Sequence, residues 1–302
     1  MKAVNLLVLL LSVFLTSNIQ AQRSTRIDGN GNLKTIKRNL SSYAIVRLDM
    51  VVDAEFVPSD QNFVEITADE NVLDRILTTV NRNILSINQD GWVEASQTVK
   101  VTIGYQDITS IINSAWGTAN LSDFEGPELW LEAEVGTIVA TGTVYQLHAK
   151  AKVGTIKATG LKANTVNVDI SGTGTVKVDV VESLNIGAMD RGKVVYVNTP
   201  ANIKAPEITD GILVSLEKEA ALPKAQYIHV TLKNNRYKKT PIRIEGPTQA
   251  PFGYGTTLAP LGKRKEKFPV GTKIYKGNGH TKADLLVVIG SEDANQVVQL
   301  FE

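Results

Sequence analysis

Val135-Gly136-Thr137-Ile138 returns almost unchanged as Val153-Gly154-Thr155-Ile156, and then as Thr173-Gly174-Thr175-Val176. Related segments, Trp116-Gly117-Thr118 and Arg191-Gly192-Lys193-Val194, stand before and after these three. The five glycines lie 19, 18, 20 and 18 residues apart along the chain. A constant period of about 20 residues is typical of stacked repeat proteins. One such repeat is too small to bury its own apolar face, so neighbouring repeats must stack into a continuous core.

Each period contains two short strands, one that ends before the glycine and one that begins after it. Residues 146–151 and 155–158 are an example, and both alternate apolar with polar side chains. Such alternation buries one row of side chains and exposes the other. A glycine at the corner permits the positive φ that a sharp bend needs. Because equivalent positions recur in register and parallel crossovers are right-handed, we predict an all-β fold whose repeat domain is a right-handed parallel β-helix.

The segments around the repeats predict the domain organisation. Residues 22–42 contain Asp28-Gly29-Asn30-Gly31-Asn32, which is turn chemistry, and are expected to be a loose lead-in. The β-repeat domain is placed at 43–205 and includes a short helix from Asp69 to Ile76, with Asp69 as its N-cap. Prolines and Asp210-Gly211 indicate a linker at 206–224. Strands separated by turns then predict a small β-sandwich at 225–302.

The start of the chain predicts export. Residues 1–21 have Lys2, an apolar run from Leu6 to Leu15, and Ala21 before Gln22, which is the pattern of a cleaved signal peptide. The chain has no cysteine, so disulfides, thiolate metal sites, cysteine nucleophiles and lipid attachment through cysteine are excluded. No later run approaches the ~18 apolar residues of a membrane helix. We expect an exported protein of the periplasm or cell surface of a Gram-negative bacterium, without a transmembrane segment in the mature chain.

The net charge of +1 conceals an asymmetry. Residues 22–219 carry 18 Lys and Arg against 25 Asp and Glu, whereas residues 220–302 carry 13 against 6. Two interpretations follow. Either the two parts merely differ in composition, which is the simpler interpretation, or the basic C-terminal part meets an acidic surface such as an anionic polysaccharide, lipopolysaccharide or the acidic rod itself.

Residues 29–200 resemble the head GIN domain family of autotransporter adhesins, which is common in Bacteroidetes. The residues that carry the resemblance are Gly29-Asn30-Gly31-Asn32, the strand from Val46 to Val57, Glu70-Asn71-Val72-Leu73, Leu85-Ser86-Ile87, Ser171-Gly172-Thr173-Gly174, Gly192-Lys193-Val194-Val195-Tyr196 and Pro200. The resemblance implies an adhesive role for the protein.

Three segments depart from the family pattern. Glu134-Val135-Gly136 and Lys152-Val153-Gly154 stand where the family has Ser-Gly-x-Gly, and Met189-Asp190-Arg191-Gly192 replaces the last such turn. A function that depends on a serine-lined face is therefore not carried over. Residues 228–302 are similar to a small β-domain of exported Bacteroidetes proteins, through Val230-Thr231-Leu232-Lys233-Asn234-Asn235 and the segment from Phe268 to Tyr275.

Residues that could support catalysis are scattered. The three histidines, His148, His229 and His280, lack metal-ligand spacing, and no Gly-x-Ser-x-Gly elbow occurs. Gly253-Tyr254-Gly255 and Gly277-Asn278-Gly279 lack the context of phosphate loops and are interpreted as turns. The serious enzymatic option is a pair of carboxylates, since glycoside cleavage uses two within about 5–10 Å. The candidate pairs are Asp169 with Asp179, on different strands of one repeat, and Glu132 with Glu134, on one face of one strand. Solvated charge on the outer face explains these carboxylates more simply.

Aromatic residues gather in sequence around the entry to the repeats, namely Trp92, Tyr105, Trp116 and Trp130. Rigid aromatic side chains are favoured anchors for partners and stack well on sugars. The preferred alternative is that Trp116 and Trp130 cap the open first coil, because terminal repeats require capping.

Together these features predict a non-catalytic, adhesin-like binding module with no catalytic, metal or cofactor residues. The expected partner is a polysaccharide or a host or matrix surface, and no nucleic acid is expected. A carbohydrate-active β-helix enzyme, either a polysaccharide lyase or a hydrolase, is the alternative. A purely structural envelope component is a third option. The sequence identifies neither the ligand nor the oligomeric state.

Overall fold

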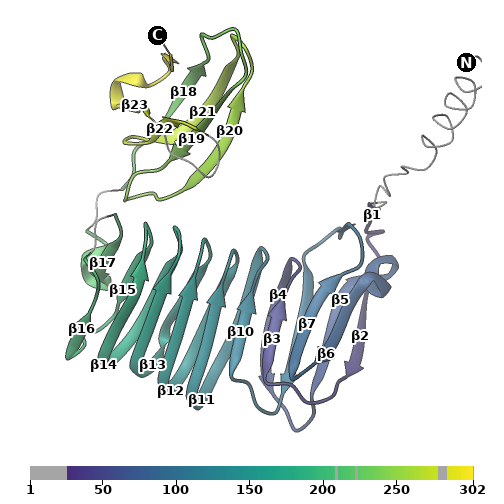
Figure 1. Ribbon diagram of the computed structural model, residues 1–302. Helices are drawn as coiled ribbons and strands as arrows, with labels where there is room; N and C mark the ends of the chain where they lie inside the picture. The colour runs from purple at the N-terminus through teal and green to yellow at the C-terminus, as the bar shows by residue number, and fades with distance from the viewer. Residues whose placement is uncertain (1–25, 208–209, 222–223, 278–283, 302) are drawn as a thin grey trace, which may run out of the picture.

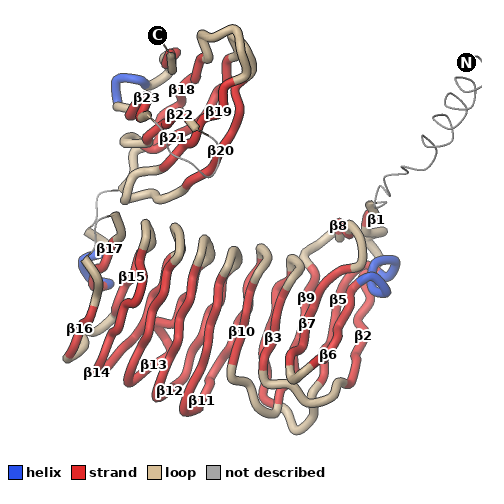
Figure 2. Tube along the Cα trace, viewed as in Figure 1, coloured by secondary structure: helices blue, strands red, loops and turns tan. Residues whose placement is uncertain are grey.

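The computed structural model describes residues 26–207, 210–221, 224–277 and 284–301, which form a long rod of stacked strands and a smaller C-terminal domain (Figures 1 and 2). The expected signal peptide at 1–21 lies outside these residues. Nearly every element is a strand, and the long strands of the rod pair in parallel, which confirms the predicted all-β fold and its large parallel sheet. The right-handed sense of the coil stays a prediction.

Four long strands turn around the rod. They are β11 (Gly117–Ala133), β12 (Thr137–Ala151), β13 (Thr155–Ile170) and β14 (Thr175–Met189). The first part of each strand stacks on one face and the last part on another, so that Thr137 of β12 pairs with Thr155 while Ala151 pairs with Ile170. The coils therefore lie in register, as the repeat spacing predicts.

Inward rows of apolar side chains form one core through the whole rod. One row comprises Val46, Ile111, Leu131, Ala149 and Val168, which are 0–2% exposed and lie at paired positions of successive coils. Burying a valine, leucine or isoleucine side chain stabilises a fold by about 1.5–3 kcal/mol. The rod thus depends on continuous stacking and not on any single coil.

The corner glycines serve a purpose that differs from the expected one. Only Gly117 has a positive φ, of 132°, while the other four described corners do not. At Gly154 a Cβ would lie 2.5 Å from the carbonyl oxygen of Gly136, which belongs to the coil beneath. That oxygen accepts a hydrogen bond of 2.9 Å from the N–H of Thr155. Glycine is therefore required because the corners of adjacent coils approach closely, and the expectation of positive φ at every corner is wrong.

One polar side chain occupies the interior of the rod at a corner. Asn113 is 2% exposed and pairs in register with Ala133, where the next coils have Ala151 and Ile170. Its side-chain amide donates to the carbonyl oxygens of Gly117, at 3.3 Å, and Thr137, at 3.1 Å. Asn113 thus satisfies two corner carbonyls of its neighbouring coils.

The first coils are not stacked in chain order. The pair β3 (Ile45–Leu48) and β4 (Val52–Pro58) lies between two other coils. On one side it pairs in parallel with the later strands β7 (Ile84–Gln89) and β9 (Val99–Tyr105). On the other side it pairs with β10 (Ser110–Asn113) and β11. Strands β3 and β4, which precede their four partners in sequence, are therefore interior to the stack.

Antiparallel strands close the N-terminal end of the rod. They are β2 (Leu33–Asn39), β5 (Phe63–Asp69) and β6 (Ile76–Asn81), and the short helix η1 (Glu70–Arg75) places Val72 and Leu73 in the core. The short strands β1 (Ile27–Asp28) and β8 (Val93–Glu94) pair beside them. The lead-in at 22–42 is thus not loose from Ile27 onward, because β2 pairs with β5 along its whole length. These elements, and not Trp116 and Trp130, cap the first coil.

The buried Asp69 links separate segments of this cap by hydrogen bonds. Its carboxylate accepts hydrogen bonds from the N–H groups of Gly31, at 2.6 Å, and Ser96, at 2.8 Å, and from the Ser96 hydroxyl at 2.6 Å. The hydrogen bond from the Ser96 hydroxyl is the main reason that the pKa of Asp69 lies below its ordinary value. The side chain does not cap the helix, contrary to the role expected from the sequence.

The rod continues beyond residue 205, into the segment predicted to be a linker. After β15 (Lys193–Tyr196) come β16 (Asn202–Lys204) and β17 (Ile212–Ser215), and β17 pairs in parallel with β15. The helix α2 (Leu216–Glu219) follows, with its Glu219 carboxylate bonded to Lys177 at 2.7 Å and to Lys193 at 2.9 Å. This strand and its ion pairs correct the linker at 206–224, whose first part belongs to the rod.

The C-terminal domain contains two small sheets around one apolar cluster. One sheet has β18 (Tyr227–Lys233), β21 (Lys263–Pro269) and β24 (Val297–Gln299). The other has β19 (Thr240–Glu245), β20 (Gly253–Leu258), β22 (Lys273–Lys276) and β23 (Leu285–Val288), and the short helix η2 (Ser291–Asp293) precedes β24. The β-sandwich stays a prediction. Gly253-Tyr254-Gly255 lies within β20, so its interpretation as a turn is wrong, while Asn278 and Gly279 lie outside the described residues.

Candidate functional site

The aromatic residues singled out in the sequence differ in their exposure to solvent. Tyr105 is buried, at 6% exposure, whereas Trp92, Trp116 and Trp130 are 58%, 66% and 49% exposed. The indoles therefore lie on the outside of the rod. Trp130 alone among these three has a ring stacked against another ring in the described structure.

Trp130 and His148 form a rigid pair on the outer face. They occupy paired positions of β11 and β12, and their ring centroids are 3.6 Å apart with an angle of 1° between the ring planes. The imidazole Nε2 lies 3.0 Å from Oε1 of Glu128 and 3.0 Å from the side-chain amide nitrogen of Gln146. The tautomer of the ring determines the hydrogen bond, since a protonated Nε2 donates to Glu128 and an unprotonated Nε2 accepts from Gln146. These contacts hold the imidazole, and with it the indole, in one orientation.

A slot opens on the other face of the indole. The next positions of the row are Ser110 on β10 and Ile45 on β3. Trp130 and Ile45 therefore stand two strand spacings apart, which is about 9.6 Å. The space between them is open because the Ser110 side chain is small. Van der Waals contact takes about 3.5–4 Å on each side of an inserted group. The slot therefore has the width for one flat ring, and it belongs to a cavity of about 450 Å³.

Charged and amide side chains surround this slot, and we refer to the cavity as the Trp130 pocket. Glu132, Lys150 and Asp169 follow one another in the next outward row, and all three line the cavity with Asn167. The Lys150 ammonium lies 2.8 Å from Glu132, and this hydrogen bond raises the pKa of Lys150 above its ordinary value. The rim offers both donors and acceptors to a ligand.

The structure rearranges the carboxylate pairs that the sequence suggested. Glu132 and Asp169 line the same pocket, on either side of Lys150 in the row. Asp179 is instead bonded to the side chain of Asn198 at 2.8 Å, and Glu134 lies at a corner. Neither of the expected pairs, Asp169 with Asp179 or Glu132 with Glu134, faces the pocket together.

The histidines do not assemble a metal site. His148 belongs to the Trp130 pocket and His229 to a hollow on the C-terminal domain, while His280 lies outside the described residues. Among the residues that the structure describes, no group of three His, Asp or Glu side chains is placed to hold a metal ion.

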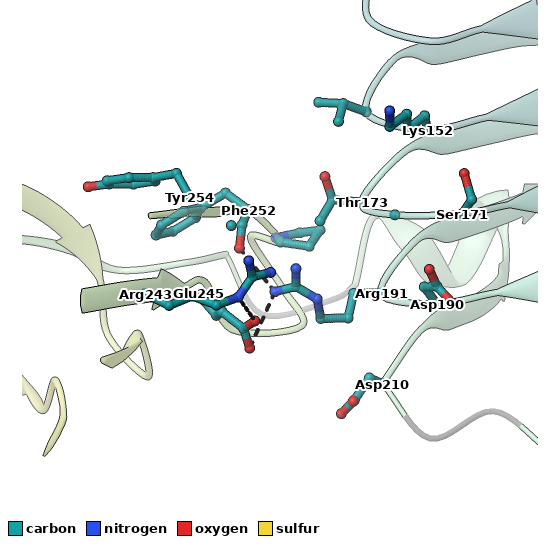
Figure 3. A pocket seen from close by; sticks show the side chains of 14 residues that line it. Lys152, Ser171, Thr173, Asp190, Arg191, Asp210, Arg243, Glu245, Phe252 and Tyr254 are labelled. Atoms are coloured by element: carbon teal, nitrogen blue, oxygen red, sulfur yellow. Dashed lines mark hydrogen bonds and ion pairs between the residues drawn. The ribbon is translucent and has the colours of Figure 1, made fainter. Parts of the chain in front are cut away.

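A second cavity, which we call the interdomain cleft, lies between the rod and the C-terminal domain (Figure 3). Its volume is about 700 Å³. The rod contributes corner residues that include Lys152, Thr173 and Arg191, and the C-terminal domain contributes residues that include Arg243 and Tyr254.

A buried carboxylate organises the floor of the cleft. Glu245 of β19, whose side chain is 5% exposed, lies 2.7 Å from Nε of Arg243 and 3.7 Å from Nη1 of Arg191. Arg191 also donates to the carbonyl oxygen of Phe252 at 3.1 Å. A residue of the rod is thus bonded to two residues of the C-terminal domain.

The sequence analysis missed this cleft because two separate domains form it. A signal was present, however, in the residue that precedes each corner glycine. This position holds Val135, Val153 and Thr173 in successive coils and then changes to Arg191. A charged residue where the repeat has apolar or neutral ones indicates a contact that the repeat itself does not need.

Comparisons with known proteins extend these observations. The family model described as "Putative auto-transporter adhesin, head GIN domain" matches residues 42–200. No curated protein sequence matches the chain. None of the helices in the described parts of the chain has the length and apolar character to span a bilayer.

Solved structures are similar to this chain at low sequence identity. A "putative adhesin" from Bacteroides fragilis is 19% identical, with a TM-score of 0.53, and the match covers 63% of this chain and 100% of that one. A "putative adhesin" from Parabacteroides merdae is 18% identical, with a TM-score of 0.41 and coverage of 63% and 99%. A "putative lipid binding protein" from Parabacteroides distasonis is 19% identical, with a TM-score of 0.39 and coverage of 64% and 100%.

Proposed function

The chain belongs to the family described as "Putative auto-transporter adhesin, head GIN domain", and we propose that it is an exported, adhesin-like binding protein of the cell envelope or surface. In this proposal the protein binds a saccharide without altering it. The resemblance at the C-terminal domain to exported β-domains is part of the same proposal. The observation that carries it is the Trp130 pocket.

Preorganisation supports a binding role for Trp130. An exposed side chain normally loses rotamer freedom when a ligand orders it, which costs about 0.5–1.5 kcal/mol. The parallel stack on His148 and the contacts of His148 with Glu128 and Gln146 fix the indole before any ligand arrives. Rigid aromatic side chains of this kind are frequent anchors in binding surfaces.

The shape and chemistry of the pocket favour a sugar ring. A pyranose presents C–H groups on its flat faces and hydroxyl groups around its edge. The open face of Trp130 offers an apolar surface for the former, and Asn167, Glu132 and Lys150 offer hydrogen-bonding groups for the latter. Because outward residues recur at the strand spacing of about 4.8 Å, an extended polysaccharide could lie along the rod and contact several coils.

The test is binding of the full chain to an array of neutral and acidic polysaccharides, followed by titration of the best ligand against two variants. Trp130→Ala is expected to weaken binding about 30-fold, since hot-spot truncations cost about 2 kcal/mol or more. Trp116→Ala, which removes an indole that is 66% exposed at a corner, is the matched control and should leave the affinity unchanged. Equal effects of the two variants would reject the Trp130 pocket as the site.

A carbohydrate-active enzyme is the alternative, and one observation favours it. Glu132 and Asp169 line the same pocket as Trp130, so two carboxylates face the place proposed for the sugar. Lys150 is bonded to Glu132, however, and an ion-paired carboxylate is a poor proton donor. Incubation with the bound polysaccharide should therefore release no new reducing ends or unsaturated products. Their appearance, and their loss in Glu132→Gln, would establish the enzyme instead.

Export is tested separately from ligand binding. N-terminal sequencing of the mature protein should give Gln22 as the first residue, and protease treatment of intact cells should remove the protein if it is displayed outside. A product that begins at Met1 would refute export. Complete protection from the protease would argue for a periplasmic protein without an adhesive role.

A further inference from the structure

We propose that the outer end of the C-terminal domain docks on a bilayer surface that carries anionic phospholipids. Two loops form this end, residues 234–239 after β18 and residues 259–262 after β20, and together with Lys263 we call them the basic tip. Both loops lie at the end of the domain that faces away from the rod (Figures 1 and 2). The surface is separate from the Trp130 pocket and does not depend on saccharide binding.

Apolar side chains of the basic tip are turned to solvent. Tyr237 is 88% exposed and Leu261 is 48% exposed. Their loops lie side by side, because the N–H of Leu261 donates to the carbonyl oxygen of Arg236 at 3.0 Å. A tyrosine ring has an apolar body and a polar hydroxyl, and for this reason it is favoured at the boundary between lipid and water. The two side chains thus provide an apolar contact for the interfacial region of a bilayer.

The backbone of Leu261 supports a role for its side chain outside the fold. Its φ is 53°, in the left-handed region that glycine and asparagine adopt most readily. Backbone conformations of this kind cost stability, and they cluster at sites of binding and catalysis. Leu261 is not buried, so core packing does not explain why a leucine occupies this position.

A buried asparagine holds the two loops in one arrangement. Asn234 is 0% exposed, and its side-chain amide donates to the carbonyl oxygens of Lys238, at 2.9 Å, and Ala259, at 2.8 Å. Its Oδ1 accepts a hydrogen bond from the N–H of Arg236 at 3.1 Å. The basic tip is therefore formed before any contact with lipid, so docking orders little of its backbone.

The basic tip carries a net positive charge. Its cations are Arg236, Lys238, Lys239 and Lys263, and it contains no Asp or Glu. None of these four side chains forms an ion pair with the parts of the chain that the structure describes. The Arg236 guanidinium lies over the Phe301 ring, 4.4 Å from its centroid, and keeps its charge there. Glu302 follows Phe301 and lies outside the described residues, and the four cations outnumber it.

The positive charge continues along the outward face of β21. Lys265 follows Lys263 on this face, and Lys233 of β18 pairs with Lys263. Glu266 pairs with the buried Val230, so it faces the other side of the sheet. The described outward positions of β18, β21 and β24 therefore include no Asp or Glu. Lys265 lies about 7 Å along the strand from Lys263, within the screening length of about 10 Å at about 0.1 M salt.

Charge and apolar contact together select a bilayer as the partner. A Lys or Arg side chain near an anionic leaflet is attracted to its negative surface potential, which strengthens binding about fivefold for each residue. A soluble polyanion offers the same charge but has no acyl region to accept Tyr237 and Leu261. Basic amphipathic helices bind membranes through the same combination of charge and apolar contact.

The experiment is cosedimentation of the chain from Gln22 onward with vesicles, because the apolar run within residues 1–21 would itself bind lipid. One preparation is phosphatidylcholine alone, and the other contains equal parts of phosphatidylcholine and phosphatidylglycerol. Binding to the second should be about tenfold or more tighter at about 0.1 M salt. It should be lost at about 1 M salt, where the screening length falls to about 3 Å.

Paired variants test the charge of the basic tip. Lys238→Gln combined with Lys239→Gln should weaken binding to the anionic vesicles about 30-fold, at about fivefold for each charge removed. The matched control, Lys157→Gln combined with Lys162→Gln, removes two exposed lysines of the rod and should leave binding unchanged. Equal affinity for the two vesicle preparations, or equal effects of the two double variants, would overturn the inference.

Single variants test the apolar contact. Tyr237→Ala should weaken binding severalfold, whereas Tyr145→Ala, at a position 65% exposed on the rod, should not. Leu261→Asn should weaken binding severalfold without loss of the fold, because asparagine tolerates the left-handed region and the melting temperature should stay equal or rise.

The same variants distinguish a bilayer from a soluble polyanion. If the lysine variant alone weakens binding while Tyr237→Ala and Leu261→Asn do not, and polygalacturonate binds as tightly as the vesicles, the bilayer is rejected as the partner. A failure of the Trp130 pocket to bind saccharide leaves each of these outcomes unchanged.

Discussion

Substituting alanine for Gly154 tests whether corner stacking determines the stability of the rod. The added Cβ would lie 2.5 Å from the carbonyl oxygen of Gly136 and 2.9 Å from that of Ala133. Both are backbone atoms, so a rotamer change cannot relieve the contact. The corner must move, which lengthens the 2.9 Å bond from Thr155 to Gly136 and the 3.0 Å bond from Thr175 to Gly154.

The expected loss for Gly154→Ala is about 1–3 kcal/mol of unfolding free energy, the usual effect of forcing an extra carbon into a packed site. At about 2–4 °C per kcal/mol for a domain of this size, the melting temperature should fall by about 2–12 °C. Gly160→Ala is the matched control, on the strand β13 that follows the Gly154 corner. Its Cβ would meet the Thr141 side-chain methyl at 3.0 Å, and Gly160 is exposed. Its effect should stay within about 0.5 kcal/mol.

Urea denaturation followed by tryptophan fluorescence reports the stability of the rod, because all three tryptophans belong to it. The midpoint should fall for Gly154→Ala at an unchanged slope, which reports a change in stability and not in compactness. If Gly154→Ala and Gly160→Ala have the same midpoint, the steric explanation of the corner glycines is wrong. A positive φ at Gly154, which would also forbid alanine, is already absent from the structure.

Asn113→Ala should lower the unfolding free energy by about 1–3 kcal/mol, because it leaves two corner carbonyls without their donor, and the same urea titration measures it. Glu219→Gln should increase proteolysis near residue 220. Burial opposes ionisation of Glu219, but hydrogen bonds from two lysines outweigh it and lower its pKa, so the wild-type protection should persist at neutral pH and be lost as pH falls through that lowered pKa. Asp69→Ala should lower the urea midpoint at neutral pH. The difference from wild type should shrink in acid, since the depressed pKa of Asp69 makes its stabilisation present only while it is ionised, and an equal difference at all pH values would contradict this.

The repeat of the sequence predicted the stacking of the coils because one geometric constraint, the close approach of corners, recurs at each period. The same repeat also predicts that Trp130 and His148 are neighbours, since they occupy paired positions one coil apart. Register within a repeat therefore predicts which outward side chains become neighbours. Their ring stack depends on side-chain rotamers that the sequence pattern does not specify.

The antiparallel strands at the N-terminal end of the rod were not predicted, for a different reason. Strands β5 and β6 have the same alternation of apolar and polar residues as the parallel strands, but they run antiparallel to their neighbours. Alternation determines which face is buried and carries no information on strand direction. The interdomain cleft likewise depends on how two domains meet, and only Arg191, as a departure from the repeat, marked its position in the sequence.

The stacking order of the first coils has a consequence for how the rod is made. Residues emerge from the ribosome in chain order, yet β3 and β4 have β7 and β9 on one side and β10 and β11 on the other. Neither neighbour exists until the chain has grown well past them. Strands β3 and β4 must therefore remain unpaired until partners arrive about 40 to 65 residues later, whereas every coil from β12 onward can add directly to a coil that is already complete. Assembly of this rod should have one slow step at its beginning and rapid growth afterwards.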